Sequence, residues 1–423
     1  MRVAIHTLGT RGDVQPYVAL ADRLIKRGHS AVIATGESFR NLVESHGVSF
    51  HPVASDLMAM LSTEAGRSVM QGGARHPIRA MRYAKAVVNP AFRRSLDDFW
   101  ASAQGADVIL YHPKAMAAPD MAKALDIPCV SVPPVPVTWP ISEFPSMAVA
   151  PTANFGPALN RLTYSLTAKA DMAFLKEINS WRESAGLPRR RAGVYAWSVD
   201  GRSIPILCPV SPALFEDVTS WNGKVYLPGF FYLDATCQAL DARLEAFLQA
   251  GERPVAVSFG SMPLKNPQAF LEMLDKALIK ADRRAVLLTG ATGIRTADGI
   301  RTADGGRIFA IESAPHALLF PRVCGVVHHG GIGTVAEALR AGAQQLIVPF
   351  SADQPFWANR LHRLGYALQP VREERLNADA LVAAFDEMAR PERAQKAAHL
   401  RERLVREDGC GAAAAYIERL TGL

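Results

Sequence analysis

The stretch Val326-Val-His-His-Gly-Gly-Ile-Gly-Thr-Val-Ala-Glu337 decides the fold of the second half of this 423-residue chain. Its first apolar residues predict a buried strand, and the helical pattern from Val335 ends at Gly342. The glycines between them allow the backbone to approach a ligand closely. A strand, a glycine-rich turn and a helix start bring free N–H groups and the positive end of a helix dipole to one point. A diphosphate is the expected occupant, and simple packing of the turn is the alternative.

Two better-known phosphate-binding patterns do not fit this stretch. The Walker pattern requires Gly-Lys-Ser/Thr, and the stretch contains no Lys. The dinucleotide fingerprint belongs to the first strand–helix unit of a domain, with an acidic residue about twenty residues on. This stretch begins only at Val326. His328 and His329 are adjacent on a strand and point to opposite faces, so they are poor joint ligands for a metal ion.

Length and composition indicate a globular chain with two domains. The length exceeds that of one ordinary domain, and 49% hydrophobic residues can supply two cores. The cysteines are scattered and odd in number, which favours a reducing cytoplasm over a disulfide framework or a zinc site. They are Cys129, Cys208, Cys237, Cys324 and Cys410. The chain begins directly with a strand pattern instead of a signal peptide, and no apolar run is long enough to span a membrane.

The net charge of +7 has two interpretations. The first is an ordinary solvated surface, and the second is attraction to anionic lipid headgroups, as in a peripheral contact with the inner membrane face. Nucleic acid is not an expected partner, because the basic residues form no recognisable binding module and lack interleaved aromatic residues.

The first half opens with a strand, a turn, a helix and a second strand. Residues 2–7 predict the first strand, residues 9–12 the turn, and residues 30–35 the second strand, with Gly28 ending the helix. This unit implies a parallel sheet, whose ligands bind at the carboxyl ends of the strands. Asp13 lies at such an end and is either a helix cap or a general base. Partial burial would make Asp13 a stronger base, because burial raises the pKa of a carboxyl group.

Further candidate residues lie in the first half. His112 ends another predicted strand and could line a substrate site, orient Asp13 or be an ordinary loop histidine. His6 is a second candidate base, although a core histidine is the simpler interpretation. The segment from Pro133 to Tyr164 is apolar and punctuated by prolines, which often indicates function. Its aromatic residues suit either the wall of an apolar binding pocket or ordinary core packing. They include Trp139, Phe144 and Phe155.

Polar residues of the second half have the chemistry to contact a phosphate or sugar hydroxyls. Ser261 follows a predicted strand, so its N–H and hydroxyl could meet a phosphate. Thr334 can cap the helix or donate to a phosphate oxygen. Asp353 and Gln354 place an acceptor-only group beside a group that both donates and accepts, which suits sugar hydroxyls. A helix cap is the alternative for Asp353.

Three separated motifs in this chain resemble those of GT-B nucleotide-sugar glycosyltransferases. The donor motif is His328-His-Gly-Gly-Ile-Gly-Thr334 followed by Val348-Pro-Phe-Ser-Ala-Asp-Gln-Pro355. The others are Gly9-Thr-Arg-Gly-Asp-Val-Gln-Pro16 and Pro315-His316 with Leu319-Phe-Pro-Arg322. The resemblance covers nearly the whole chain. It is greatest to the sterol glucosyltransferases and to related bacterial enzymes that act on lipids and antibiotics.

The resemblance implies an α/β fold of two Rossmann-like domains, each with a doubly wound parallel sheet, facing a cleft. The acceptor-binding domain would be residues 1–217, with a C-terminal helix at about 405–423 packing back on it. The donor-binding domain would be residues 225–404, after a linker near residues 217–224.

The resemblance also assigns donor-binding roles. His328 and the helix dipole would stabilise the departing diphosphate, and the backbone of Ala314, with His316 nearby, would read uracil or thymine. Glu337 would hold the ribose hydroxyls, although its distance from His328 is one residue longer than in plant relatives. The predicted donor site is Gly12, Ser261, Ala314, His316, His328, Gly330, Gly331, Gly333, Thr334, Glu337, Asp353 and Gln354.

The activity implied is an inverting transfer of a hexose, most simply glucose from UDP-glucose, to a hydroxyl of a sterol, terpenoid or polyketide. Asp13 would be the base, and no metal or cofactor beyond the donor is expected, because the chain lacks the Asp-x-Asp metal pattern. One alternative is a dTDP-deoxysugar transferase. Another is an inactive nucleotide-sugar-binding protein, against which the intact Asp13, His328, Asp353 and Gln354 argue. A monomer or homodimer is expected.

Overall fold

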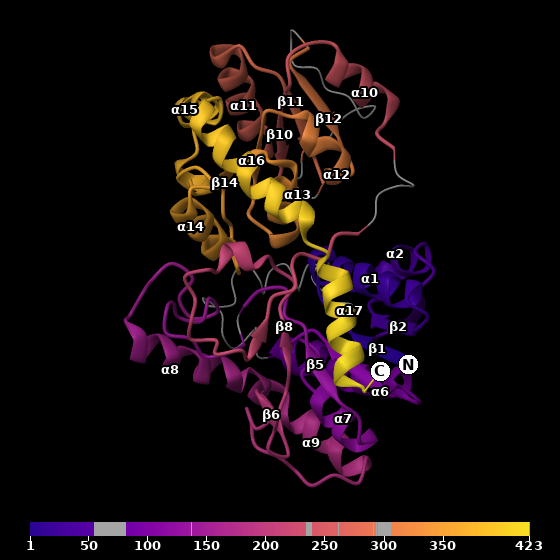
Figure 1. Cartoon of the computed structure of the whole chain (residues 1–423). Coiled ribbons are helices and arrows are strands. Elements are labelled where there is room, and N and C mark those ends of the chain that lie inside the picture. Colours follow the sequence, from indigo (N-terminus) through magenta and orange to yellow (C-terminus); the bar gives the residue numbers. More distant parts are fainter. Residues whose placement is uncertain are drawn as a thin grey trace. The chain divides into compact units, whose positions relative to one another are not determined.

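The computed structural model describes residues 1–54, 82–136, 138–233, 239–260, 262–290, 292, 294 and 306–422. These residues form two compact units, each with its own sheet (Figure 1). Unit 1 consists of Met1–Leu233 and Asp408–Leu423, and unit 2 of Asp234–Glu407.

Unit 1 contains a seven-stranded sheet in the order β3-β2-β1-β4-β5-β8-β9, and its neighbouring strands run parallel. The strands are β1 (Arg2–His6), β2 (Ser30–Thr35), β3 (Ser49–Pro52), β4 (Val108–Tyr111), β5 (Cys129–Ser131), β8 (Ile206–Leu207) and β9 (Val225–Tyr226). A separate antiparallel pair is formed by β6 (Ser198–Val199) and β7 (Arg202–Ser203).

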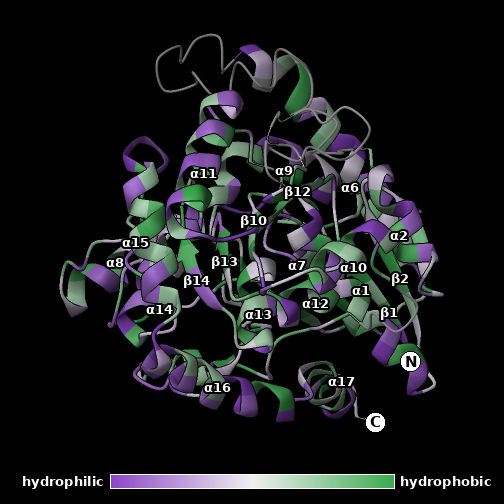
Figure 2. Cartoon of the chain, turned by 90° about the horizontal axis from the view of Figure 1, so that it is seen from above, coloured by the Kyte–Doolittle hydropathy of each residue, from purple (hydrophilic) through white to green (hydrophobic). Residues whose placement is uncertain are grey.

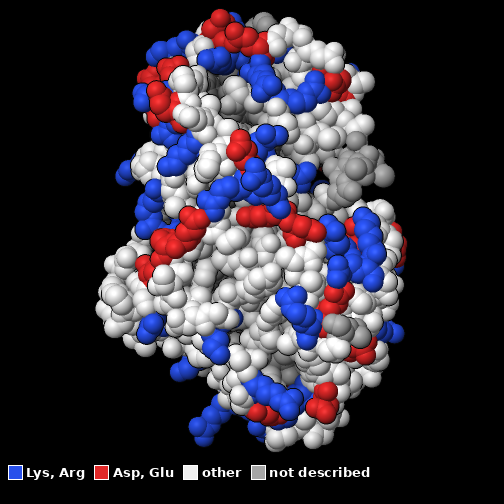
Figure 3. All heavy atoms as spheres, viewed as in Figure 1, with Lys and Arg blue, Asp and Glu red and all other residues white. Residues whose placement is uncertain are grey.

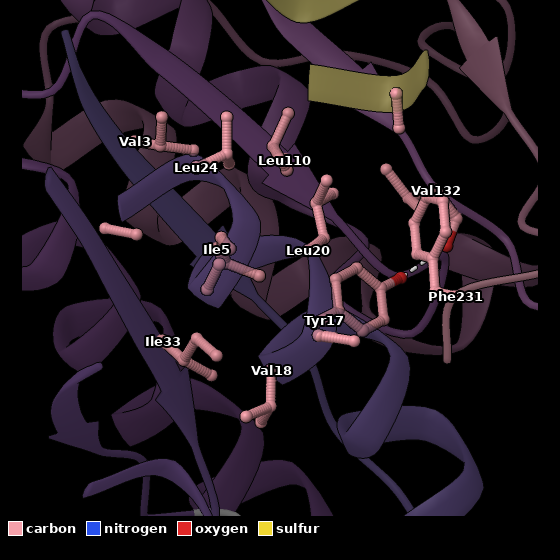
Figure 4. Packing of buried hydrophobic residues seen from close by; sticks show 14 of the residues in the cluster. Val3, Ile5, Tyr17, Val18, Leu20, Leu24, Ile33, Leu110, Val132 and Phe231 are labelled. Atoms are coloured by element: carbon pink, nitrogen blue, oxygen red, sulfur yellow. Dashed lines mark hydrogen bonds between the residues drawn. The ribbon is translucent and has the colours of Figure 1, made fainter. Parts of the chain in front are cut away.

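Helices cover both faces of this sheet because successive strand side chains point to opposite sides. Val3 and Ile5 of β1 pack with Leu20 in one core, drawn in Figure 4, whereas Ala4 belongs to the core on the other face. The α-helices are α1 (Arg11–Lys26), α2 (Arg40–Glu44), α6 (Asn89–Ala103), α7 (Ala118–Leu125), α8 (Pro157–Thr167), α9 (Leu175–Ser184) and α17 (Gly409–Leu420).

Unit 2 repeats this architecture with a five-stranded parallel sheet in the order β12-β11-β10-β13-β14. The strands are β10 (Val255–Ser258), β11 (Ala285–Leu288), β12 (Ile308–Ile311), β13 (Gly325–His328) and β14 (Gln344–Ile347). The helices are α10 (Ala242–Gln249), α11 (Pro267–Ala281), α12 (His316–Leu319), α13 (Ile332–Ala341), α14 (Gln354–Leu364), α15 (Ala378–Met388) and α16 (Pro391–Arg406).

The boundary between the units differs from the predicted linker at residues 217–224. β9 pairs with β8 and extends the sheet of unit 1, so the chain stays in that unit as far as Leu233. The last helix, α17, packs on α1 and buries Ala413, Ala414 and Ile417 in the core that contains Val3. The chain therefore returns to unit 1 after completing unit 2.

The outer helices are amphipathic, as the mixture of purple and green along α11, α15 and α16 shows in Figure 2. Within the described ranges, no helix combines the length and apolar character that crossing a bilayer requires.

Candidate functional site

Asp13 lies in the first turn of α1, directly beyond the carboxyl end of β1. Thr10 is the N-cap residue, and the Asp13 carboxylate accepts hydrogen bonds from the Thr10 N–H (2.7 Å) and hydroxyl (3.0 Å). Asp13 therefore forms part of a capping box. A capping role does not account for its other two neighbours.

His112 and Lys114 also contact the Asp13 carboxylate. β4 pairs with β1, and this pairing brings His112, the residue after β4, beside the start of α1. His112 Nε2 lies 3.1 Å from Asp13 Oδ1, although the ring N–H is not aligned for a straight hydrogen bond. His112 Nδ1 accepts the N–H of Lys114, and the Lys114 ammonium lies 2.9 Å from Asp13 Oδ2. Of the three interpretations of His112, the contact fits the one in which it orients Asp13.

The electrostatics of Asp13 differ from the expectation. Burial opposes ionisation, but His112 and Lys114 outweigh it and hold the pKa of Asp13 well below its ordinary value. Burial also lowers the pKa of His112, so this imidazole is neutral at pH 7. Gly9 is required here: it has a φ of +140°, and a Cβ would lie 2.1 Å from Asp13 Oδ2. The site therefore holds a fixed, ionised carboxylate.

The other candidates in unit 1 lie in different surroundings. His6 is fully buried, stacks on Phe99 and lies 3.1 Å from Ser102 Oγ, so it is a core histidine. Phe144 is also buried, which favours core packing over an acceptor wall. Trp139 makes an edge contact with Trp197, at 6.4 Å between ring centroids. Phe155 is 47% exposed.

The glycine-rich turn of unit 2 joins β13 to α13. Gly331 is the N-cap residue, so the N–H groups of Ile332, Gly333 and Thr334 are the first of the helix. Gly330 has a φ of +90°, and a Cβ there would lie 2.7 Å from Ile347 Cγ2. Gly333 is exposed, and among the described residues no other atom lies within 4 Å of the position that a Cβ would take. The turn has the geometry of an anion site.

Protein groups enclose the side chain of His328. It is fully buried at the end of β13, where Nε2 lies 3.0 Å from Gln345 Oε1 and Nδ1 accepts the N–H of Gly330. Burial lowers its pKa to about 3. Both ring nitrogens are thus occupied by the protein, which corrects the predicted contact between His328 and the diphosphate.

The side chain of His329 lies against the glycine-rich turn instead. As the next residue along the chain it points to the other side, between Gly260 and Gly331. A Cβ on Gly331 would lie 2.4 Å from its Nε2, and its Nδ1 has no hydrogen-bond partner among the described residues. Burial lowers the pKa of His329 to about 4, so the ring is neutral at pH 7. Counting from His329 also removes the one-residue difference in spacing to Glu337.

Two predicted donor residues lie further along α13. Thr334 is buried in the first turn and is not the N-cap residue, since Gly331 holds that place. Glu337 is half-buried, and burial raises its pKa despite the nearby Arg340. Its carboxyl group remains a candidate for ribose hydroxyls.

Asp353 and Gln354 lie at the start of α14. Asp353 is the N-cap residue by position, but its carboxylate accepts the indole N–H of Trp357 at 3.0 Å. Gln354 is buried, and its Oε1 accepts the N–H groups of Phe350 (2.8 Å) and Ser351 (3.1 Å). Gln354 therefore orders the loop between β14 and α14, which the sequence did not indicate.

The remaining predicted donor residues are placed as follows. Ala314 and His316 flank the start of α12, where the His316 ring stacks on Phe320 with centroids 4.4 Å apart. Gly12 is exposed in the first turn of α1, in unit 1. Ser261 lies outside the described residues. Within those residues, no group of three or more His, Cys, Asp and Glu side chains is arranged to hold a metal ion.

Sequence reasoning missed Lys114 and His329. Lys114 follows the end of β4 by three residues, but its side chain is long and half-exposed, so its contact with Asp13 could not be predicted. His329 directly follows β13 and points to the side opposite His328.

Comparison with known proteins supports the resemblance. Residues 3–102 match the glycosyltransferase family 28 N-terminal domain, and residues 295–410 match the erythromycin biosynthesis protein CIII-like C-terminal domain. The O-mycaminosyltylonolide 6-deoxyallosyltransferase of Streptomyces fradiae is 32% identical, over 99% of this chain and 97% of that protein. A sterol 3-beta-glucosyltransferase of Arabidopsis thaliana is 31% identical, over 99% of this chain but only 66% of its own length.

Solved structures share the fold. The glycosyltransferase of kitacinnamycin superposes with a TM-score of 0.73 at 22% identity, covering 99% of this chain and 98% of that one. The calicheamicin glycosyltransferase CalG4 gives a TM-score of 0.70 at 16% identity, covering 100% and 98%. Because the relative from Streptomyces fradiae matches over nearly its full length, this chain belongs to the GT-B nucleotide-sugar glycosyltransferase family and is a glycosyltransferase.

Proposed function

We propose that the enzyme transfers a hexose, with inversion, from a nucleoside diphosphate sugar to a hydroxyl of a lipophilic acceptor. Unit 2 holds the donor diphosphate at the start of α13, and Asp13 of unit 1 activates the acceptor. The observation that carries the proposal is the Asp13 carboxylate, fixed by Thr10, His112 and Lys114 beyond the carboxyl ends of β1 and β4. A sterol or a polyketide is the proposed class of acceptor, because the relatives named above are sterol and tylonolide transferases.

The proposed reaction forms one bond and breaks one. The acceptor oxygen attacks the anomeric carbon of the sugar while the bond from that carbon to the diphosphate oxygen breaks. The acceptor proton passes to Asp13, and the electron pair leaves with the nucleoside diphosphate. The N–H groups of Ile332, Gly333 and Thr334 and the ring of His329 stabilise the charge that develops there. We propose that no metal ion takes part, since the sequence lacks the Asp-x-Asp pattern.

Displacement of Lys114 by the acceptor would allow the Asp13 carboxylate to accept this proton despite its depressed pKa. While the ammonium contacts Asp13 Oδ2, the carboxylate is a weak base. An acceptor hydroxyl that takes the place of the half-exposed ammonium removes the cationic neighbour of the carboxylate and leaves Thr10 and His112 in place. The pKa of Asp13 then rises, and its basicity increases at the moment the substrate is bound.

The test is the Asp13→Asn variant, which keeps the size of the side chain and removes the base. Transfer is expected to fall about 10²- to 10⁴-fold. Donor binding, measured by calorimetry, should be unchanged, because Asp13 belongs to unit 1. Asp22→Asn is the matched control on the same helix, where Asp22 pairs with Lys26. Full transfer by Asp13→Asn would refute the assignment of the base, and NMR of the product reports whether the anomeric centre has inverted.

UDP-glucose is the first donor to test, and a dTDP-deoxysugar is the second. The second is favoured by the Streptomyces fradiae relative, a 6-deoxyallosyltransferase that this chain matches over nearly its whole length. Mass spectrometry of products from a panel of UDP- and dTDP-sugars with sterol and polyketide acceptors separates the two. If donors bind but neither transfer nor donor hydrolysis occurs with any of them, the protein is a nucleotide-sugar-binding protein instead.

A further inference from the structure

Helix α8 in unit 1 has its polar side facing inward. Asn160, Thr163 and Tyr164 are buried, and each bonds to the segment 142–146. Asn160 Nδ2 donates to the Ser142 carbonyl at 2.8 Å, and the Thr163 hydroxyl accepts the Ser146 N–H at 2.8 Å. The Tyr164 hydroxyl donates to the carbonyl of Phe144 at 3.3 Å. These bonds fix the orientation of the helix through polar contacts.

The outward side of α8 carries three exposed leucines. Leu159, Leu162 and Leu166 are 56%, 58% and 62% exposed. Their spacing of three and four residues puts them on one stripe of the helix, and the exposed Phe155 lies just before the N-cap residue Gly156. On an ordinary surface helix such a stripe faces the core, as Tyr17, Leu20 and Leu24 of α1 do. A helix fixed by its polar side and exposing its apolar side indicates a docking surface.

The charges around α8 are positive. Arg161, Lys169 and Lys176 are exposed and form no ion pair within the described residues. The nearby acids are already engaged: Asp171 pairs with Arg190 at 2.5 Å, and Glu177 accepts from Asn89. Figure 3 shows the surface over α8, at lower left, as white with separate blue groups.

We propose that this face of α8 docks on the surface of an anionic membrane. The leucines would enter the boundary between headgroups and acyl chains, and the three cations would contact lipid phosphates. Exposed leucines flanked by unpaired basic side chains match such a surface in both polarity and charge. A protein partner with no particular charge would not require the cations. The proposal goes beyond the transfer reaction and does not depend on it, because binding to vesicles needs neither donor nor acceptor.

The test is co-sedimentation of the full-length protein with vesicles of phosphatidylcholine alone and of phosphatidylcholine with phosphatidylglycerol. Binding is expected to the anionic vesicles and to fall with added salt. The triple variant Leu159→Ser, Leu162→Ser, Leu166→Ser should lose at least about tenfold in partitioning. Its control is Ile279→Ser with Val405→Ser, at 55% and 61% exposure in unit 2, which should bind as wild type does.

The charge variant Arg161→Gln, Lys169→Gln, Lys176→Gln should reduce binding to anionic vesicles, by about fivefold for each charge. Lys265→Gln with Lys280→Gln is its control, with both lysines in unit 2.

Thermal unfolding checks that each variant is folded, and transfer to a water-soluble acceptor should be kept. Absence of wild-type binding to anionic vesicles, or full binding by the leucine variant, overturns the proposal. A leucine variant that instead turns a dimer into a monomer, seen by light scattering, identifies the face as a contact between two copies and overturns it too.

Discussion

Lys114 helps to hold Asp13 ionised through a contact of 2.9 Å, in addition to the larger effect of His112. The pKa of Asp13 is depressed in the folded protein, so its contribution to stability is present above the unfolded carboxyl pKa and is lost as the pH falls through the folded value. Replacing Lys114 by Met removes a cation and raises the pKa of Asp13. If Asp13 must be ionised to act, the acidic limb of the rate–pH profile moves to higher pH in Lys114→Met.

Lys26→Met is the control for that shift, because Lys26 pairs with an acid on the same helix, Asp22, at 2.8 Å. The free energy of unfolding should change by less than about 1 kcal/mol in either variant, since both lysines are largely solvated. An unchanged acidic limb in Lys114→Met, with transfer retained, would show that Lys114 does not tune the base.

His328 and His329 give opposite predictions although they are neighbours. His329→Ala removes a ring from the turn before α13, so calorimetry should show UDP or dTDP affinity reduced up to about tenfold, with stability nearly unchanged. His328→Ala leaves a cavity and deprives Gln345 and the Gly330 N–H of their partner. Its free energy of unfolding should fall by about 2–4 kcal/mol in denaturant titrations. A stable His328→Ala protein that no longer binds the diphosphate would reverse the two assignments.

Two glycines of the turn between β13 and α13 separate folding from binding. Gly330 has a φ of +90° and no room for a Cβ, so Gly330→Ala should destabilise unit 2 by about 1–3 kcal/mol. Gly333 lies in the first turn of α13 and has open space around it, so Gly333→Ala should leave the free energy of unfolding unchanged or slightly higher. The added methyl group occupies space next to the N–H groups, so nucleotide affinity should fall nonetheless. Denaturant titrations and calorimetry measure the two effects; equal behaviour of the two variants would contradict this division.

Elements with strong local signals could be predicted from the sequence. Gly342 and Gly365 end α13 and α14 in the left-handed conformation, as their positions indicated. The side to which each residue at the end of β13 points could not be predicted, because helices cover both faces of the sheet and Val326 and Val327 are buried in the cores on opposite faces. For that reason the sequence did not show which of His328 and His329 lies against the glycine-rich turn. The sequence also did not indicate that α8 buries its polar side and exposes its leucines, because its inward contacts are made to the irregular segment 142–146.

At the scale of the whole chain, α17 belongs to unit 1 although unit 2 separates it from the rest of that unit in sequence. It is held by a buried apolar side and by ion pairs of Arg23 with Asp408 and Arg27 with Glu418. Each unit has cores of its own, so each is expected to open as a separate cooperative unit.

Ile417→Ala and Leu381→Ala test this separation, because both side chains are fully buried, the first in unit 1 and the second in unit 2. Each truncation should cost about 2–5 kcal/mol, which corresponds to a loss of amide protection on the order of 30-fold or more. Hydrogen exchange should show the loss in the strands of unit 1 for Ile417→Ala and in those of unit 2 for Leu381→Ala. Because α17 packs on α1, β1 and β2 should be among the strands affected by Ile417→Ala. A uniform loss across both units in either variant would mean that the chain unfolds as one cooperative body, and that the last helix stabilises more than the unit it packs on.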